Sequence, residues 1–173
     1  MTVGRVVQVN VSPKGGVPKL PVEAAEVGVN GLVGDAVRYT KIHGGPERAV
    51  CLFPLELIET LRAEGHPVFP GSTGENLTLA GLDWPALEPG DVVAIGEAVR
   101  LQLTTRVEPC KTIRDSFAGG DFKRIKPSRV PGETRWYTRV LAGGTVRPGD
   151  PVAVETRAAE VVQGVSKPAR RTS

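Results

Sequence analysis

The sequence predicts a single, mostly β domain, a closed or partly closed barrel of short strands with one or two short helices. The 173 residues include 21 glycines and 15 prolines, which favours tight turns between short strands over a helical bundle. Seven or eight short segments have the length and pattern of strands, and one has a clear helical period. The tripeptide Pro-Gly-Asp occurs at 89–91 and 148–150, each time before a short apolar strand.

The N-terminal part of the chain is expected to contain two strands and a long turn-rich connection. Residues 3–11 alternate valine with polar side chains and predict a half-buried strand. Residues 12–21 form a loop, and residues 23–29 are a weaker strand candidate. Residues 47–53 contain an unbroken apolar run, which is typical of a strand buried on both faces.

One helix follows this buried strand. Pro54 suits a first helical turn, Leu57, Ile58 and Leu61 form an apolar stripe, and Gly65 ends the helix. Residues 111–117 could form a helical turn, and residues 118–134 are interpreted as a long surface loop. Further strands are expected at 76–80, 91–95, 99–104, 136–141 (with a short helix as the alternative) and 152–155, which makes residues 1–155 the barrel domain and residues 156–173 a tail.

Composition excludes several classes of protein. No window of about eighteen apolar residues is present, so we expect no membrane span. The start of the chain lacks the pattern of a signal peptide, and its two cysteines cannot form a disulfide scaffold, so a cytoplasmic location is expected. With eight aromatic residues and a net charge of +3, nucleic-acid binding is not expected.

Several kinds of cofactor site are also absent from the sequence. There is no Gly-x-Gly-x-x-Gly motif and no phosphate-binding loop, which argues against the usual nucleotide-dependent oxidoreductases. The four soft ligands, His43, His66, Cys51 and Cys110, have no paired spacing, which argues against a structural zinc site. His66 is interpreted as solvated, and Phe53, Phe69 and Trp84 as core residues.

Cys110 is the first candidate for chemistry. Arg106, Lys111 and Arg114 lie within four residues of it, and cationic neighbours favour the thiolate, which is the nucleophile and the metal ligand. The alternative is a small apolar residue at the end of a strand, and the residues leave both interpretations open. Cys51 lies within an apolar strand and is interpreted as a core residue.

Two glycine-containing motifs are candidate binding sites. In the segment from His43 to Arg48, the Gly44 and Gly45 backbone could approach an anion, and Arg48 could bind it through two parallel hydrogen bonds. The alternative is a hairpin loop with an exposed arginine. The Gly-Glu-Asn motif that ends in Glu75 and Asn76 could be a binding motif or only a turn into a strand.

The small net charge hides a division along the chain. Residues 1–110 carry nine basic and thirteen acidic side chains, whereas residues 111–139 carry eight basic and three acidic ones. A charge run is usually a solvated face. Because this one follows the candidate thiolate, it also suits an anionic ligand held near a reactive sulfur.

Together these segments resemble the MOSC domain, the family named for the C-terminal domain of molybdenum cofactor sulfurases. The resemblance covers about residues 3–155, and its subgroup is similar to the small bacterial stand-alone proteins of hydroxylaminopurine resistance. The motifs that carry it are Gly31-Leu-Val-Gly-Asp35, His43-Gly-Gly-Pro-Glu-Arg-Ala-Val-Cys51, Gly74-Glu-Asn-Leu77, Pro109-Cys110, residues 136–141 and Pro148-Gly-Asp150. The chain departs from the family where Leu52 and Phe53 follow Cys51, where Arg135 replaces a common glycine, and where longer relatives continue into a helical region.

The resemblance implies a β-barrel that binds a molybdenum cofactor (molybdopterin), with Cys110 as the ligand of molybdenum. It further implies reduction of N-hydroxylated substrates, with electrons from a partner protein, and associates the family with pyridoxal phosphate binding. The expected cofactor-binding residues are His43, Gly44, Gly45, Arg48, Glu75, Asn76, Lys111, Arg114, Arg135 and Arg139. One alternative is a sulfur carrier in which Cys110 takes a persulfide from a cysteine desulfurase. A second is a non-catalytic domain that stores the cofactor or binds a partner.

Overall fold

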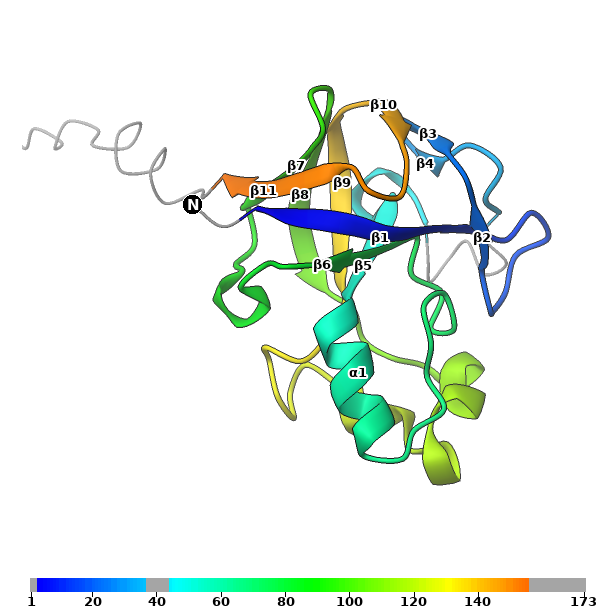
Figure 1. The fold of residues 1–173 in the computed structure, drawn as a ribbon. Coiled ribbons are helices and arrows are strands. Elements are labelled where there is room, and N and C mark those ends of the chain that lie inside the picture. Colours follow the sequence, from blue (N-terminus) through cyan, green and yellow to red (C-terminus); the bar gives the residue numbers. More distant parts are fainter. Residues whose placement is uncertain (1–2, 37–43, 156–173) are drawn as a thin grey trace, which may run out of the picture.

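The computed structural model describes residues 3–36 and 44–155, and strands dominate it (Figure 1). The mostly β fold predicted from the sequence is confirmed. The strands are β1 (Gly4–Val11), β2 (Leu20–Val22), β3 (Ala25–Gly28), β4 (Gly31–Leu32), β5 (Val50–Pro54), β6 (Leu77–Ala80), β7 (Val92–Ile95), β8 (Val99–Arg106), β9 (Trp136–Ala142), β10 (Gly144–Val146) and β11 (Pro151–Glu155). The α-helix is α1 (Leu55–Ala63), and 3₁₀ helices span Pro46–Arg48, Trp84–Ala86, Lys111–Ser116, Ala118–Gly120 and Phe122–Ile125.

Seven of these strands close into a barrel. Their order is β11-β7-β8-β9-β5-β6-β1, and the ring closes because β1 also pairs with β11. Neighbouring strands are antiparallel except β5 and β6, which are parallel because α1 connects them as a crossover. β2 extends the sheet beyond β1, and a small sheet of order β10-β3-β4 lies beside the barrel (Figure 1).

The interior of the barrel is filled by apolar side chains that alternate along its strands. Val9, Leu52, Leu77, Leu101 and Trp136 come from five different strands, and each is at most 1% exposed. Burial of this many large apolar side chains is the main favourable contribution to the stability of such a domain. The strands predicted at 3–11, 76–80 and 99–104 are confirmed as β1, β6 and β8.

β5 has every residue buried, as its apolar run predicts, but its two faces have different neighbours. Val50 and Leu52 face the barrel interior. Phe53 belongs to a second apolar cluster outside the barrel, formed with α1 and the 3₁₀ helices that follow β8. Successive side chains of a strand alternate between faces, so Cys51 also points away from the barrel interior.

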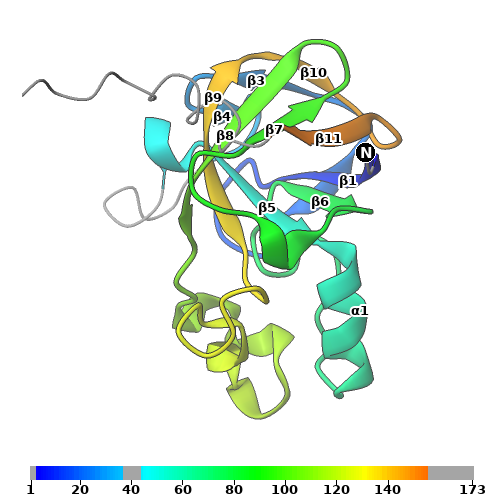
Figure 2. The ribbon, with the colours of Figure 1, turned by 90° about the vertical axis from the view of Figure 1, so that its left-hand side faces the viewer.

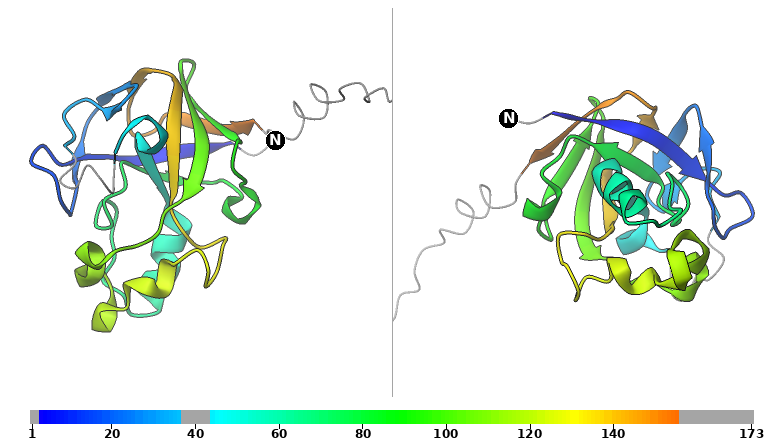
Figure 3. Two further views of the ribbon diagram at one scale, coloured as in Figure 1. Left: turned by 180° about the vertical axis from the view of Figure 1, so that it is seen from behind. Right: turned by 60° about the horizontal axis from the view of Figure 1, so that its bottom comes forward.

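The second cluster joins α1 to the segment 107–135 outside the barrel (Figure 2; Figure 3, right). The prediction of a surface loop at 118–134 is wrong in part, because Ile125 and Thr134 are fully buried. Thr134 donates to the carbonyl oxygens of Val107 and Ile125 at 3.3 and 2.9 Å. Single apolar residues between charged ones carry no periodic signal, so the sequence alone hides this packing. The members of the cluster are Phe53, Leu57, Ile58, Leu61, Val68, Ile113, Phe117 and Ile125.

Polar contacts also hold this segment against α1. Arg124 forms a two-point ion pair with Glu64, at 2.8 and 2.9 Å, and a further one with Glu133 at 2.9 Å. The His66 imidazole is 10% exposed, and its Nδ1 accepts a hydrogen bond from the Ala118 backbone N–H at 3.0 Å. The interpretation of His66 as solvated is therefore wrong. Phe69, expected in the core, is 46% exposed.

The shorter elements and the turns between the main strands were predicted only in part. The helical turn expected at 111–117 is a 3₁₀ helix, and residues 136–141 form the strand β9. The short strands β2, β4 and β10 were not expected, and β2 begins within the predicted loop at 12–21. Both Pro-Gly-Asp turns form, and in each the aspartate accepts a backbone hydrogen bond, from Glu88 or from Arg147. The tail predicted at 156–173 lies outside the described residues. Among the helices described, none is long and apolar enough to cross a membrane.

Candidate functional site

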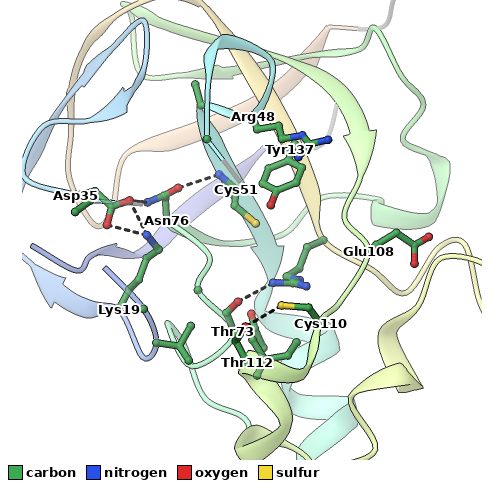
Figure 4. Close-up of a pocket in the computed structure, with 18 of the residues that line it drawn as sticks. Lys19, Asp35, Arg48, Cys51, Thr73, Asn76, Glu108, Cys110, Thr112 and Tyr137 are labelled. Carbon is green, nitrogen blue, oxygen red and sulfur yellow. Dashed lines mark hydrogen bonds and ion pairs between the residues drawn. The ribbon is translucent and has the colours of Figure 1, made fainter. Parts of the chain in front are cut away.

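A cavity of about 340 Å³ lies on the outer side of β5 and β9, where segments distant in the sequence converge (Figure 4). This volume is within the range of small-molecule sites, roughly 300–1,000 Å³. Its walls come from the loop after β1, the residues after β4, the start of β5, the loop before β6, residues 108–115 and the start of β9. Two thiols, two arginines, a lysine and a tyrosine line it.

Cys110 lies in the wall of this cavity, just after β8 and directly before the 3₁₀ helix Lys111–Ser116. Its side chain is half-buried, and its Sγ lies 2.9 Å from the Thr112 hydroxyl (Figure 4). At this distance the two groups form a hydrogen bond in which either atom can be the donor. The arrangement provides a soft, accessible donor atom in a partly enclosed site.

The neighbouring helix explains which charged residues reach the cavity. A 3₁₀ helix has three residues per turn, so residues three apart share a side. Thr112 and Asp115 share the side that lines the cavity, whereas Lys111 and Arg114 share a side that is exposed and lies outside the cavity.

Arg106 stacks on Trp136, with its guanidinium carbon 4.5 Å from the ring centroid. These three cations, expected to act on Cys110, are therefore not part of the cavity wall.

Cys51 and Tyr137 form the back of the cavity. They are directly opposite each other in the antiparallel pairing of β5 and β9, so their side chains share one face. Burial raises the pKa of the Cys51 thiol from 9.0 to about 11. Burial likewise raises the pKa of Tyr137 above its ordinary value. Both groups are therefore protonated at neutral pH. The interpretation of Cys51 as a buried core residue is confirmed, and the residue also borders the cavity.

The raised pKa of Cys51 predicts a pH-dependent contribution to stability. When the chain unfolds, this thiol ionises near its ordinary pKa of 9.0, whereas in the folded chain it keeps its proton to about pH 11. Between these values the unfolded state binds fewer protons, so the free energy of unfolding falls as pH rises, by roughly 1.4 kcal/mol per pH unit. Denaturant titrations of the wild-type chain and of Cys51→Ala should show this extra slope in the wild type. Parallel curves through this window would contradict the prediction.

A partly buried ion pair forms a further wall of the cavity. Lys19 Nζ lies 2.7 and 2.6 Å from the two carboxylate oxygens of Asp35, and the two side chains are 12% and 10% exposed. The same carboxylate accepts hydrogen bonds from the Ser12 backbone N–H at 2.8 Å and from Asn76 Nδ2 at 2.9 Å. Asn76 Oδ1 in turn accepts from the Cys51 backbone N–H at 3.0 Å. This chain of contacts fixes Lys19 beside the cavity.

Gly71 allows the loop that carries Lys19 to approach. Its φ of +91° is a conformation that favours glycine, and a Cβ there would meet the Lys19 carbonyl oxygen at 2.3 Å. The Lys19 backbone N–H donates to the Gly71 carbonyl oxygen at 2.9 Å. The close contact holds the loop after β1 against the loop before β6, and so brings Lys19 and Asn76 to the same cavity.

Arg135 and Arg48 line the cavity from different elements. Arg135 precedes β9, is 6% exposed, and donates from Nη1 to the Thr73 carbonyl oxygen at 2.7 Å. Arg48 ends the 3₁₀ helix Pro46–Arg48, and its guanidinium carbon lies 5.7 Å from the Tyr137 ring centroid (Figure 4). Arg48 and Arg135 are thus the two arginines of the expected set that line the cavity.

Glu75 is buried beside the cavity and does not line it. Its side chain is 0% exposed and accepts hydrogen bonds from the Gly71 backbone N–H and the Thr73 and Thr78 hydroxyls, at 2.8, 2.8 and 2.9 Å. Burial raises the pKa of Glu75 above its ordinary value, although these hydrogen bonds act in the opposite direction. Glu75 therefore lies outside the cavity wall, and its hydrogen bonds shape the loop that ends at Asn76.

The structure thus divides the residues predicted for the site. Those that line the cavity are Gly44, Arg48, Asn76, Cys110 and Arg135. Those that do not are Gly45, Glu75, Lys111, Arg114 and Arg139. Arg139 is exposed and pairs with Glu47 at 2.9 Å, because β9 has left the cavity by that residue. His43 lies outside the described residues.

Sequence reasoning missed Lys19, Asp35, Thr112 and Tyr137. Asp35 ends the motif Gly31-Leu-Val-Gly-Asp35, which carries the family resemblance, so this motif could have identified it as a site residue. The strand alternation of β9 puts Tyr137 on the same face as Arg135, which is a second usable signal. Lys19 has no local signal, since only its contacts with Asp35 and Gly71 place it in the cavity.

The fold and the cavity define a β-barrel in which a half-buried thiol, a buried arginine and a partly buried lysine share one cavity on the outside of the barrel wall. A family model of the MOSC domain matches residues 39–153. The chain belongs to the MOSC domain family.

Three relatives share sequence with this chain. YflK of Bacillus subtilis, described as uncharacterized, is 36% identical over 108 residues, covering 62% of this chain and 48% of YflK. YiiM of Escherichia coli is 29% identical over 135 residues, covering 76% of this chain and 59% of YiiM. A protein of Gibberella moniliformis named Reductase is 28% identical over 131 residues, covering 73% of this chain and 23% of its own length. The chain therefore spans about half the length of the first two relatives.

Solved structures agree with the fold. YiiM from Geobacillus stearothermophilus superposes with a TM-score of 0.65 at 27% sequence identity, covering 89% of this chain and 76% of that chain. The YuaD protein from Bacillus subtilis gives a TM-score of 0.70 at 15% identity, covering 90% of this chain and 99% of that chain, and supports the fold alone.

Proposed function

We propose that this protein binds a molybdenum cofactor in the cavity and reduces N-hydroxylated compounds with electrons from a partner protein. The observation that carries the proposal is the half-buried thiol of Cys110 in the same cavity as two arginines. Family membership supports it, because MOSC domains are associated with the molybdenum cofactor. The relative named Reductase supports reduction as the class of reaction.

The donor groups of the cavity fit such a cofactor. A thiolate is a soft ligand of the kind that transition metals bind, and Cys110 offers one. The phosphate of the cofactor needs cationic donors, and Arg135 has a buried Nε with no hydrogen-bond partner among the described residues. Cys110 would hold the metal, while Arg48, Arg135 and Lys19 would hold anionic parts of the cofactor.

When bound, the cofactor would supply the two-electron redox chemistry needed to reduce an N–OH group. The overall change consumes two electrons and two protons, breaks the N–O bond, and yields the N–H compound and water. Burial keeps the Cys51 thiol and the Tyr137 hydroxyl protonated, so both groups can donate hydrogen bonds to a substrate in the cavity. The sequence contains no flavin, nicotinamide or iron–sulfur signature, so the electrons are assigned to a partner.

Metal and pterin analysis tests this proposal. The protein is purified under reducing conditions from a host that makes the cofactor and from a matched host that cannot. We expect about one molybdenum and one pterin per chain from the first host only, since one thiol binds one metal centre. The loaded protein should then reduce an N-hydroxylated compound when a chemically reduced dye supplies electrons.

Each outcome of this experiment has a defined meaning. Equal and negligible molybdenum from both hosts would contradict cofactor binding. A full load without reduction by any donor would contradict the reductase activity and favour cofactor storage. The unloaded protein from the second host is the control for reduction by the dye itself.

A sulfur carrier is the second candidate. The half-buried Cys110 and the Thr112 hydroxyl 2.9 Å from its sulfur favour it, because a persulfide needs one accessible thiol with a stabilised anion. Incubation with a cysteine desulfurase and cysteine, followed by intact mass measurement, tests this function. One added sulfur that is absent from Cys110→Ala is the expected result for a carrier, and an unchanged mass would rule it out.

A further inference from the structure

Arg135 is an unusual residue within the cavity. Its side chain is 94% removed from solvent, since only 6% of the residue is exposed, yet it lines the cavity. A guanidinium has five N–H donors and no acceptor. Among the described residues, its recorded hydrogen bond is the one from Nη1 to the Thr73 carbonyl oxygen, and Nε has no partner.

Two other poorly exposed cations of this chain are paired with carboxylates. The Lys19 side chain is 12% exposed and pairs with Asp35, and the Arg124 side chain is 15% exposed and pairs with Glu64 and Glu133. In the part of the chain that the structure describes, no ion pair is recorded for Arg135. It is therefore a buried cation for which the described residues supply no counter-ion.

The carboxylates of the cavity do not fill this role. Asp35 already accepts hydrogen bonds from Lys19, Asn76 and Ser12. Glu108 and Asp115 are exposed at the cavity rim, and neither has an ion pair with Arg135. A buried charge without a partner is strongly unfavourable, and an oxyanion that enters the cavity would remove that penalty.

We propose that Arg135 forms an oxyanion subsite in this cavity, which binds a phosphate or carboxylate group of the ligand. The inference deepens the proposed function, on which it rests for the role of the cavity, but it concerns a group of this chain that needs no metal. A planar guanidinium with unused donors matches an oxyanion through parallel hydrogen bonds. Lys19 and Arg48, in the same cavity, add positive charge around the subsite.

The first test uses the full-length protein free of cofactor, with inorganic phosphate as the probe at constant ionic strength. Phosphate should raise the midpoint of thermal unfolding, because a ligand that binds only the folded state stabilises it. It should also shift the ¹H–¹⁵N NMR signal of Arg135 Nε.

In Arg135→Gln, the affinity for phosphate should fall by roughly tenfold or more, as expected for the loss of a charge-assisted hydrogen bond. Arg129→Gln is the matched control, since Arg129 is exposed and pairs with Asp121 at 3.3 Å.

A readout without phosphate separates binding from a structural role. If Arg135 mainly stabilises the fold, Arg135→Met should unfold at a lower temperature in phosphate-free buffer. An unpartnered buried charge would instead destabilise the wild type. In that case Arg135→Met should be at least as stable as the wild type in phosphate-free buffer, and phosphate should not stabilise the variant further. The proposal is overturned if phosphate leaves the Nε signal unmoved, or if Arg135→Gln and Arg129→Gln bind phosphate alike.

A second arm identifies which molecule carries the oxyanion. If it belongs to the cofactor, Arg135→Gln from a cofactor-making host should contain less pterin per chain than Arg129→Gln. If it belongs to the substrate, pterin content should be unchanged, and the KM should rise for an N-hydroxylated compound that carries a carboxylate but not for its neutral analogue. If the wild-type chain itself lacks molybdenum, the proposed function fails while the phosphate result still stands.

Discussion

Replacing Cys110 with alanine is expected to lower the molybdenum retained by the purified protein by roughly a hundredfold or more and to abolish reduction of N-hydroxylated compounds. Loss of a residue that only orients a ligand already costs about 10–100-fold in metal affinity, so loss of the ligand itself should cost at least as much. Cys110→Ser should fail as well, because a hydroxyl is a harder ligand than a thiolate. Metal analysis and activity of matched preparations measure both effects.

Two variants sharpen this prediction. Thr112→Val removes the hydroxyl 2.9 Å from the Cys110 sulfur and should lower metal content less than loss of the thiol does. Cys51→Ala removes the other thiol of the cavity, which burial keeps protonated because its pKa is about 11. If Cys51→Ala lost the metal and Cys110→Ala retained it, Cys51 would be the ligand and the assignment of Cys110 would be wrong.

Replacing Glu75 with leucine is expected to reduce the free energy of unfolding by roughly 3 kcal/mol or more. The change leaves the Gly71 backbone N–H and the hydroxyls of Thr73 and Thr78 without their acceptor in a fully buried site. Each buried donor left unpaired costs about 1–3 kcal/mol. Chemical denaturation measures the loss. A cost below about 1 kcal/mol would show that the site relaxes around leucine.

Glu75→Gln is the matched control and should cost less than about 1 kcal/mol, because its amide oxygen can still accept from Gly71 and Thr78. The Thr73 hydroxyl, which donates to Glu75 in the wild type, has only to turn so that it accepts from the new amide. Burial raises the pKa of Glu75, so above its ordinary pKa of 4.5 the unfolded state loses this proton first, and stability falls as pH rises. Glu75→Gln should lack this slope. If it were as unstable as Glu75→Leu, the ionised carboxylate would be the form that the fold requires.

Most of the barrel could be predicted from local sequence pattern. Alternation in β1 and β8, the apolar run of β5 and the stripe of α1 are short-range signals, and all four elements formed where expected. The segment 107–135 could not be predicted in the same way. Ile125 and Thr134 are buried among charged neighbours by contacts with residues distant in the sequence, which no local period records.

The candidate site shows the same division more clearly. Charge and motif identified Cys110, Arg48, Asn76 and Arg135, all of which line the cavity. They also favoured Lys111 and Arg114, which the three-residue turn of a 3₁₀ helix places on its exposed side.

The sequence by itself determined the mostly β fold, the family and the thiol on which the proposed chemistry depends, because strand period, turn residues and short motifs are properties of neighbouring residues. The tertiary structure alone decided that Lys19 and Asp35 pair beside the cavity, that Glu75 is buried behind it, and that Arg135 has no counter-ion among the described residues. These outcomes depend on which strands and loops pack together across the closed barrel. Burial and pairing of a charged side chain are set by those long-range contacts, so they cannot be read from its neighbours in the chain.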